Sequence, residues 1–476
     1  MKAQEVENKY QAVMARQAEI LSRASGVDYD RFRKGRLVFD YQALMDSTGY
    51  SLEQIADIQG RCKVGHTPLL ELKNLTRLAR NLAPSGLGAR IFVKDEACNA
   101  SGSFKARRAS LSVWESKRLG YPGVIAATSG NYGAAVAAMA AMQGQRCLIL
   151  QEVYDSRGLG QPEIVEKGRA CEAYGAEVWQ TTVGPELFYT HLVLLEETGF
   201  YNASLYTPFS VAGIQTLGHE IGTEVKEITG RPPAVVVATH SGGGNSTGTA
   251  MGLGAAGCES TQVIGASVDL RGLNMASDRD FNRKSFTTGH TGFGVPFLTN
   301  PDRTEVPYNA ARALRFLDRY VSVDQGAVFY ITQLLAELEG LERGPAGNTS
   351  LTAAFKLAQE MPEDEVIVVQ ETEYTGAGKH PTAQLSFARE NGVKVVRGPS
   401  GLNVPGEVIA IPEKLSDVVY EEIDLQRIRA SYLRGQLSRL GIEDEMELTH
   451  DEVTYLAAET RLSTEECLRL LVTCRT

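Results

Sequence analysis

The sequence predicts an α/β fold built on mostly parallel β-sheet, and three observations carry this prediction. Short apolar runs rich in β-branched residues recur between residues 89 and 370. Alanine-rich or amphipathic segments separate several of these runs, and small-residue turns follow three of them. Strands of a parallel sheet are buried on both faces and therefore have nearly continuous apolar sequences. Their alternation with helices is typical of α/β proteins.

The chain begins with a charged segment that we expect to be helical over residues 1–60. Ser51 and Gln54 stand three residues apart at the start of one expected helix, as in a capping box. The turn at 65–69, with the sequence Gly-His-Thr-Pro-Leu, then opens the core.

The core alternates between the two patterns. Helical segments are expected at 134–142, 216–229 and 352–360. Expected strands are residues 89–93, 123–127, 146–150, 176–180, 234–238, 263–268 and 365–370.

The last part of the chain, residues 416–476, is again charged and helical in pattern. Thr449 and Ser463 each precede a Glu by three residues and are expected to cap helices. We expect this extension to pack on the core or on a neighbouring subunit.

Composition excludes several classes of protein. The chain has 476 residues and a formal net charge of −10, which argues against a nucleic-acid or membrane-surface protein. No apolar run reaches the length of a membrane span, and the N-terminal residues are too polar for a signal peptide. The seven cysteines are scattered without C-x-x-C spacing, so we expect reduced thiols, no metal site and a cytoplasmic location.

Lys105 is the first candidate for chemistry. It follows the turn 101–104 (Ser-Gly-Ser-Phe), just after the strand expected at 89–93. Sites of α/β proteins form at such carboxyl ends of strands. A lysine held away from water has a lowered pKa, and its neutral amine can form a Schiff base with an aldehyde. Taken alone, however, Lys105 is better explained as an ordinary surface lysine.

A second turn, Thr128-Ser129-Gly130-Asn131, lies between an expected strand and an expected helix. Its backbone N–H groups and the helix N-terminus suit an anion such as a substrate carboxylate. The Asn131 amide could donate a hydrogen bond to a phenolate-like oxygen. An ordinary Asn-Gly turn explains the pattern about equally well.

A third turn, Ser241-Gly242-Gly243-Gly244-Asn245, follows the strand expected at 234–238. Glycines let the backbone approach a phosphate and present its N–H groups, and Ser241 and Asn245 add side-chain donors. Residues 242–248 also nearly match a dinucleotide-binding fingerprint. No acidic residue ends a following strand at the right distance, and no Walker lysine is present.

The order of the three turns, each behind a strand, favours one joint interpretation. They supply an amine, an amide beside it and a cradle for a phosphate. This combination points to pyridoxal phosphate and therefore to amino-acid chemistry.

The same residues resemble the motifs of the fold type II, or tryptophan synthase β-like, pyridoxal phosphate enzymes. The turn 65–69 is similar to the entry motif of that family, and 101–107 to its lysine motif, in the version of threonine synthase. The turn 128–133 is similar to its loop for the substrate carboxylate and the cofactor oxygen, and 241–245 to its phosphate loop.

This resemblance spans roughly residues 60–415 and implies two open-sheet αβα domains with the cofactor between them. It implies a large cofactor-binding domain over 61–104 and 226–415, and a small mobile domain over 105–225. Helical extensions then occupy 1–60 and 416–476.

The resemblance also implies roles for individual residues. Lys105 would hold pyridoxal phosphate, and either Thr372 or Glu371, after the strand 365–370, would face the pyridine nitrogen. Implied cofactor-binding residues are Lys105, Asn131, Ser241, Gly242, Gly243, Gly244, Asn245 and Thr372, and implied substrate-binding residues are Ser101, Thr128, Ser129 and Gly130.

Within the family, the length, both extensions and the stretch 99–108 are most similar to a branch of coenzyme A-dependent thiolases. This implies cleavage of 2-amino-4-oxopentanoate by coenzyme A into acetyl-CoA and alanine, as in ornithine degradation. It also implies a homo-oligomer joined by a small α subunit.

Further side chains could serve such a reaction. Cys98 could accept an acetyl group, although a buried small side chain is the commoner role of a free cysteine. Arg283 and Lys284 could bind phosphates of coenzyme A, although a solvated loop explains the two charges better. His290 could polarise the ketone oxygen of the substrate.

Other interpretations stay open. A pyridoxal phosphate enzyme of β- or γ-replacement or elimination, similar to threonine synthase or diaminopropionate ammonia-lyase, would act without coenzyme A. A nucleotide-binding oxidoreductase would use the loop 242–248. A non-catalytic partner subunit would not need Lys105, Asn131 and the phosphate loop together.

Overall fold

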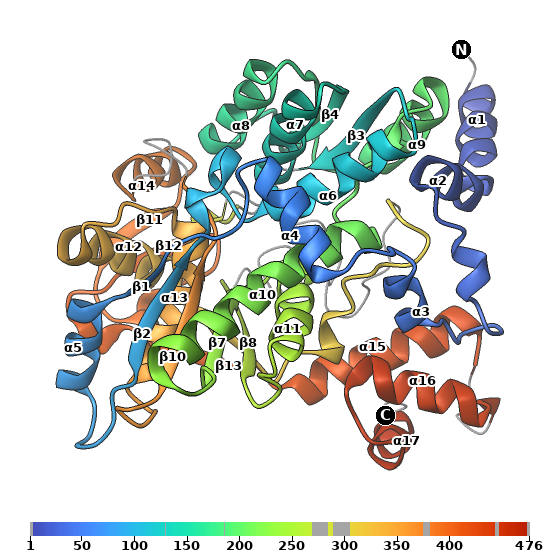
Figure 1. The fold of residues 1–476 in the computed structure, drawn as a ribbon. Coiled ribbons are helices and arrows are strands. Elements are labelled where there is room, and N and C mark those ends of the chain that lie inside the picture. Colours follow the sequence, from blue (N-terminus) through green and yellow to red (C-terminus); the bar gives the residue numbers. More distant parts are fainter. Residues whose placement is uncertain are drawn as a thin grey trace.

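A computed structural model describes residues 3–128, 130–184, 186–268, 284–288, 305–374, 381–442 and 447–473 (Figure 1). These residues form two main β-sheets with helices packed on them, and helical segments at both ends of the chain.

The larger sheet has seven strands in the order β1-β2-β10-β7-β8-β9-β13. Its inner strands β2, β10, β7, β8 and β9 are parallel, and β1 and β13 pair antiparallel at the two edges. The strands are β1 (Leu69–Glu71), β2 (Arg90–Asp95), β7 (Val235–Thr239), β8 (Gln262–Val268), β9 (Arg319–Val323), β10 (Val366–Glu371) and β13 (Tyr420–Glu422).

Helices cover the larger sheet because its strands are apolar on both faces. One helix, α13, packs across β2, β10, β7, β8 and β9. Another, α11, packs on β7 and β8, and α10 packs against α11. The helices of this part are α5 (Lys73–Leu82), α10 (Pro208–Thr229), α11 (Gly244–Ala255), α12 (Gln325–Glu339), α13 (Pro345–Ala358) and α14 (Pro381–Glu390).

The smaller sheet has four parallel strands in the order β5-β4-β3-β6. Its strands are β3 (Gly123–Thr128), β4 (Arg146–Tyr154), β5 (Glu177–Thr182) and β6 (Tyr201–Asn202). The alanine-rich helix α7 is buried along most of its length between this sheet, α6 and α8. The helices here are α6 (Lys105–Arg118), α7 (Asn131–Gln143), α8 (Pro162–Ala173) and α9 (Glu186–Thr198).

All the strands expected from the apolar runs are present, and the predicted α/β class is confirmed. The sequence did not reveal β1, β6, β9, β13 or the separate parallel pair β11 (Lys394–Arg397) and β12 (Val408–Ile411). Most of these strands are short or partly exposed, so their sequences lack a long apolar run. The predicted domain boundaries remain predictions.

Helices occupy both ends of the chain. The capping boxes expected at Ser51 and Thr449 are both formed, and Ser463 caps its helix through Glu466. The C-terminal segment also contributes the edge strand β13, which the sequence did not predict. The helices are α1 (Ala3–Ala15), α2 (Gln17–Ser25), α3 (Tyr41–Asp46), α4 (Leu52–Arg61), α15 (Leu425–Leu440), α16 (His450–Thr460) and α17 (Thr464–Thr473).

Two further observations concern the whole described chain. None of its described helices combines the length and the apolar character that crossing a bilayer requires. The six cysteines in the described ranges are free thiols, and all but Cys98 are buried.

Candidate active site

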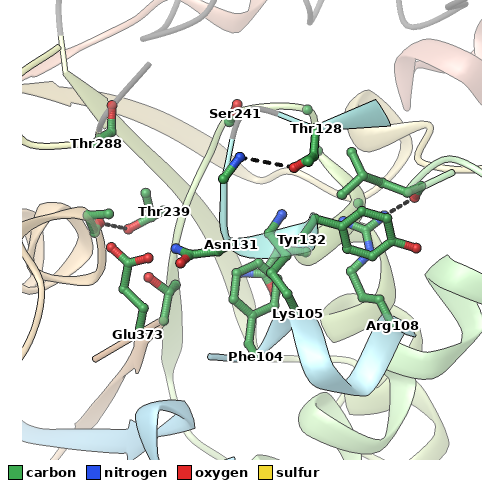
Figure 2. A pocket seen from close by; sticks show the side chains of 18 of the residues that line it. Phe104, Lys105, Arg108, Thr128, Asn131, Tyr132, Thr239, Ser241, Thr288 and Glu373 are labelled. Atoms are coloured by element: carbon green, nitrogen blue, oxygen red, sulfur yellow. Dashed lines mark hydrogen bonds between the residues drawn. The ribbon is translucent and has the colours of Figure 1, made fainter. Parts of the chain in front are cut away.

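The predicted site residues meet around a cavity of about 160 Å³ at the carboxyl ends of strands from both sheets (Figure 2). Its wall comes from the start of α6, the β3–α7 turn, the β7–α11 turn and the segment after β10. Of the predicted residues, the wall includes Lys105, Thr128, Gly130, Asn131, Ser241, Gly242, Gly243, Gly244, Asn245 and Thr372.

Lys105 is the first residue of α6, and its ammonium group lies 4.7 Å from the centre of the Phe104 ring. Burial lowers the pKa of Lys105 to about 7; the positive charge of Arg108 adds to this effect and Glu373 opposes it. The amine is therefore about half neutral at pH 7, as a nucleophile toward an aldehyde must be.

Backbone hydrogen bonds attach the lysine turn to the segment after β10. The Phe104 N–H donates to the Thr372 carbonyl at 3.0 Å, and the Tyr374 N–H donates to the Gly102 carbonyl at 2.8 Å. Gly102 needs its positive φ of 72° for this turn. These bonds bring Lys105 and Thr372 to one cavity although they are far apart in the sequence.

The turn after β3 presents its backbone to the cavity. The Thr128 hydroxyl oxygen accepts hydrogen bonds from the N–H groups of Gly130 at 3.0 Å and Gly133 at 3.3 Å. The Thr128 hydroxyl therefore stabilises the turn, whereas the resemblance implies that Thr128 binds the substrate. Asn131, the first residue of α7, points into the cavity (Figure 2). Ser129 lies outside the described residues.

The glycines after β7 are required by close packing. A Cβ atom on Gly242 would lie 2.2 Å from the Tyr206 hydroxyl, and one on Gly244 would lie 2.5 Å from Nη2 of Arg108. Gly243 also has a positive φ of 81°. Any larger residue would fill the space beside the backbone N–H groups at the start of α11.

This loop fits a phosphate group. The first N–H groups of a helix have no partner within the helix, and they attract anions. Asn245 is 6% exposed, and neither atom of its side-chain amide has a hydrogen-bond partner among the described residues. A buried amide without a partner is costly, so a polar ligand is needed here.

The structure separates the two candidates for the pyridine nitrogen. Thr372 lines the cavity, whereas Glu371 is fully buried away from it, where its Oε1 atom would lie 1.9 Å from a Cβ atom on Gly347. Burial, with the nearby charges of Glu373 and Asp95, raises the pKa of Glu371 well above its usual value. Successive residues of a strand point to opposite faces, which is why the two neighbours differ.

Ser101 is not part of the cavity wall. It has a positive φ of 67°, and its hydroxyl has no hydrogen-bond partner among the described residues. The structure therefore places Ser101 in the turn that presents Lys105.

Two of the further candidates lie away from the cavity. The Cys98 thiol donates to Asp95 at 3.3 Å, and burial and that carboxylate raise its pKa, which opposes the thiolate form. Lys284 is neither solvated nor available to a phosphate, because its side chain is 2% exposed and pairs with Asp155 at 2.8 Å. Arg283 and His290 lie outside the described residues.

The cavity also has charged lining residues that the sequence analysis missed. Arg108 follows Lys105 by three residues and thus lies on the same face of α6, a spacing that could have revealed it. No local pattern marks the carboxylates that line the wall, which are Glu152, Glu163, Glu305 and Glu373.

Comparisons with known proteins agree with this site. A family model described as "Pyridoxal-phosphate dependent enzyme" matches residues 62–373. The chain is 60% identical over 455 residues to a "2-amino-4-ketopentanoate thiolase beta subunit" from an unknown prokaryotic organism, with 96% of each chain covered. It is 57% identical over 456 residues to the subunit of that name from Acetoanaerobium sticklandii, again with 96% of each covered.

More distant relatives share only the core. Cystathionine beta-synthase of Rattus norvegicus is 27% identical over 320 residues, which are 64% of this chain and 52% of the relative. Among solved structures, a variant of O-ureido-L-serine synthase bound to O-ureido-L-serine is similar with a TM-score of 0.51 and 19% identity, covering 68% of this chain and 92% of that one. Cysteine synthase from Entamoeba histolytica is similar with a TM-score of 0.50 and 22% identity, covering 67% and 87%.

The structural likenesses show the fold, and the family match covers most of the core. The cavity is lined by a buried lysine and by a glycine-rich loop at a helix N-terminus. The chain belongs to the pyridoxal phosphate-dependent enzyme family, with the type II fold.

Proposed function

We propose that this enzyme cleaves 2-amino-4-oxopentanoate with coenzyme A to give acetyl-CoA and alanine. The observation that carries this proposal is the identity of 57–60% to the thiolase beta subunits over 96% of the chain. That similarity includes both terminal extensions, which lie outside the matched family core at 62–373. The replacement enzymes match only 64% of the chain.

Four parts of the cavity would hold the cofactor. Lys105 would bond to its aldehyde carbon, the loop 241–245 would bind its phosphate, Asn131 would donate to its phenolic oxygen, and Thr372 would face its ring nitrogen. When bound, pyridoxal phosphate accepts electrons from the carbon skeleton of an amino acid. A threonine hydroxyl, unlike a carboxylate, leaves the ring nitrogen unprotonated.

Lys105 is the residue we assign to proton transfer. Burial lowers the pKa of Lys105, so its amine could take the proton from the α carbon of the substrate and later give a proton back. Phe104, packed against the amine, shields it from water. The β3–α7 turn would meanwhile orient the substrate carboxylate through the backbone at Gly130.

The bond changes follow from the proposed products. The sulfur of coenzyme A bonds to the C4 carbonyl carbon, and the C3–C4 bond breaks. The electron pair of that bond remains on C3, which takes a proton to become the methyl group of alanine. A cavity of about 160 Å³ is smaller than the clefts of about 300–1,000 Å³ that hold large ligands, so only the thiol end of coenzyme A would enter it.

We also propose a heteromer, because the similar proteins are named as beta subunits. A small second subunit would complete the site, and the reaction would belong to ornithine degradation in the cytoplasm.

The test is a mass-spectrometric assay with 2-amino-4-oxopentanoate, with and without coenzyme A. The enzyme would be loaded with pyridoxal phosphate and co-expressed with the small protein encoded beside it. Acetyl-CoA and alanine that form only with coenzyme A, and not with Lys105→Ala, would support thiolysis. Ammonia or a keto acid formed regardless of coenzyme A would instead indicate a lyase of the same family.

A further inference from the structure

Arg108 is a buried cation in the cavity wall, and no carboxylate of the described residues pairs with it. It is 2% exposed, its Nε donates to the Ser210 hydroxyl at 3.0 Å, and its Nη2 donates to the Leu205 carbonyl. Within the described parts of the chain, no carboxylate oxygen lies within ion-pair distance of it. Burial lowers the pKa of Arg108, and the hydroxyls of Tyr132 and Tyr206 only partly oppose this effect.

The neighbouring Arg107 differs from Arg108 because it has carboxylate partners. Arg107 is equally buried, but it contacts Glu96 at 2.7 Å and Glu220 at 2.8 Å. A buried charge without a counter-charge is strongly unfavourable in a protein interior. Arg108 therefore has the environment of a group that acquires its counter-ion with a ligand.

The position of Arg108 indicates which ligand supplies the charge. The guanidinium lies against the phosphate loop, since a Cβ atom on Gly244 would be 2.5 Å from Nη2 and 2.9 Å from Cζ. Gly244 is the first residue of α11, and the unpartnered amide of Asn245 follows it. A guanidinium, a helix N-terminus and a buried amide thus line the same cavity, and Figure 2 shows Arg108 in its wall.

We propose that Arg108 binds the phosphate group of pyridoxal phosphate and neutralises its charge. The glycine loop offers neutral N–H donors, and Arg108 adds the full positive charge that a phosphate dianion requires. This inference rests on the cofactor and not on the thiolytic reaction, so it holds whichever amino acid the enzyme cleaves.

The charge of Arg108, at the phosphate end of the proposed cofactor site, also affects Lys105 at the aldehyde end. Before the cofactor binds, the positive charge of Arg108 helps to keep Lys105 neutral and ready to attack the aldehyde. After binding, the phosphate offsets the charge of Arg108, so this repulsion decreases and Lys105 can carry a proton more easily.

The experiment measures dissociation constants of the cofactor-free protein for pyridoxal phosphate and for pyridoxal, which has the same aldehyde but no phosphate. Arg108→Gln should weaken binding of pyridoxal phosphate by about 10- to 100-fold, as expected for a hydrogen-bonded charge, and change pyridoxal binding by less than about threefold. Arg108→Lys should weaken the binding of pyridoxal phosphate less than Arg108→Gln does. Arg118→Gln, on the exposed part of the same helix, should bind both ligands as the wild type does.

Equal weakening of both ligands, or of neither, would overturn the proposal, because the phosphate would then not be the group that Arg108 recognises. A ³¹P NMR titration of the wild type keeps the assignment open to refutation even if Arg108→Gln does not fold. The bound phosphate should stay dianionic at pH values below the pKa of about 6 of a free phosphate ester. Ordinary titration near pH 6 would refute the assignment. Neither measurement uses substrate, so failure of the thiolase proposal would be seen separately.

Discussion

Burial shifts Lys105, in the cavity wall, and Glu371, buried behind it, toward their neutral forms. The pKa of Lys105 falls to about 7, and that of Glu371 rises well above its usual value. The same physical cause acts in opposite directions, because one group is charged when protonated and the other when deprotonated. Only Lys105 faces the cavity, so only its shift bears on the reaction.

The pKa of Lys105 predicts how pH controls capture of the cofactor. Below pH 7 the rate at which the cofactor-free protein binds pyridoxal phosphate should fall about tenfold per pH unit, and above about pH 8 it should level off. Stopped-flow absorbance across pH 5.5–9.5 would measure this rate, with Lys105→Ala as the control that shows no lysine-bound signal. A rate still rising at pH 9.5 would contradict the assignment.

The raised pKa of Glu371 predicts that the stability of the protein depends on pH. Its pKa is raised in the folded state, so the folded protein retains a proton that the unfolded chain releases above about pH 4.3. Stability from this group is therefore present at low pH and is lost as pH rises toward the folded-state pKa. Glu373 and Asp95 contribute to the shift, and Arg343 opposes it.

Glu371→Gln keeps the size of the side chain and removes this proton. The variant should melt at a higher temperature than the wild type at pH 8, and the difference should shrink toward pH 5. Glu363→Gln, at an exposed position, provides the matched control. If calorimetry showed parallel pH profiles for wild type and Glu371→Gln, the carboxyl would be ionised in the folded protein.

Among the elements, α10 and α11 depend on glycine for their close contact. A Cβ atom on Gly218 would lie 2.0 Å from the Thr249 carbonyl oxygen, and one on Gly252 would lie 2.0 Å from that of Gln215. The two helices thus touch backbone to backbone, and this contact positions the glycine-rich loop at the start of α11, where we expect the phosphate to bind.

Gly218→Ala should therefore destabilise the enzyme by about 1–3 kcal/mol and weaken its binding of pyridoxal phosphate. Gly254→Ala is the control within α11, because a Cβ atom there meets nothing within 4 Å. That variant should keep its cofactor affinity and gain up to about 1 kcal/mol from helix propensity. Denaturant titration and cofactor titration would measure both effects; equal behaviour of the two variants would refute the packing argument.

At the scale of the whole molecule, ion pairs of Arg107 connect the start of α6 to the larger sheet and to α10. It contacts Glu96, directly after β2, and Glu220 of α10, and all three side chains are buried or nearly so. The chain continues from α6 into the smaller sheet, so this cluster connects the helix that leads into that sheet with the end of β2 and with α10.

Arg107→Gln would leave the buried Glu96 carboxylate without its cation, while Glu220 keeps its ion pair with Lys94 at 3.0 Å. We expect a loss of about 3–5 kcal/mol in the free energy of unfolding, as is typical when one member of a buried ion pair is removed. Arg33→Gln breaks a pair with Asp30 in which both side chains are exposed, and should cost at most about 1 kcal/mol. Urea denaturation would compare the two, and a similar small loss in both would show that the buried cluster is not structural.

The sequence alone predicted the fold class, most of the inner strands and the three turns that line the cavity. Apolar runs mark strands such as β7 and β10 because each run must be buried on both faces. Small-residue turns mark the places where backbone must approach a ligand, and Lys105, Asn131 and Gly242 all line the cavity as expected. These features are local, so they can be recognised without knowing which segments meet.

Which side chains face the cavity, and which charges are paired, depends on how distant segments pack against one another. Lys284 binds Asp155 across 129 residues, and Thr372 rather than Glu371 reaches the cavity because of the way β10 packs against α13. The role proposed for Arg108 depends on the loop at Gly244, which lies beside its guanidinium in the folded chain. Burial and pairing depend on contacts between distant segments, and a local pattern of residues does not encode them.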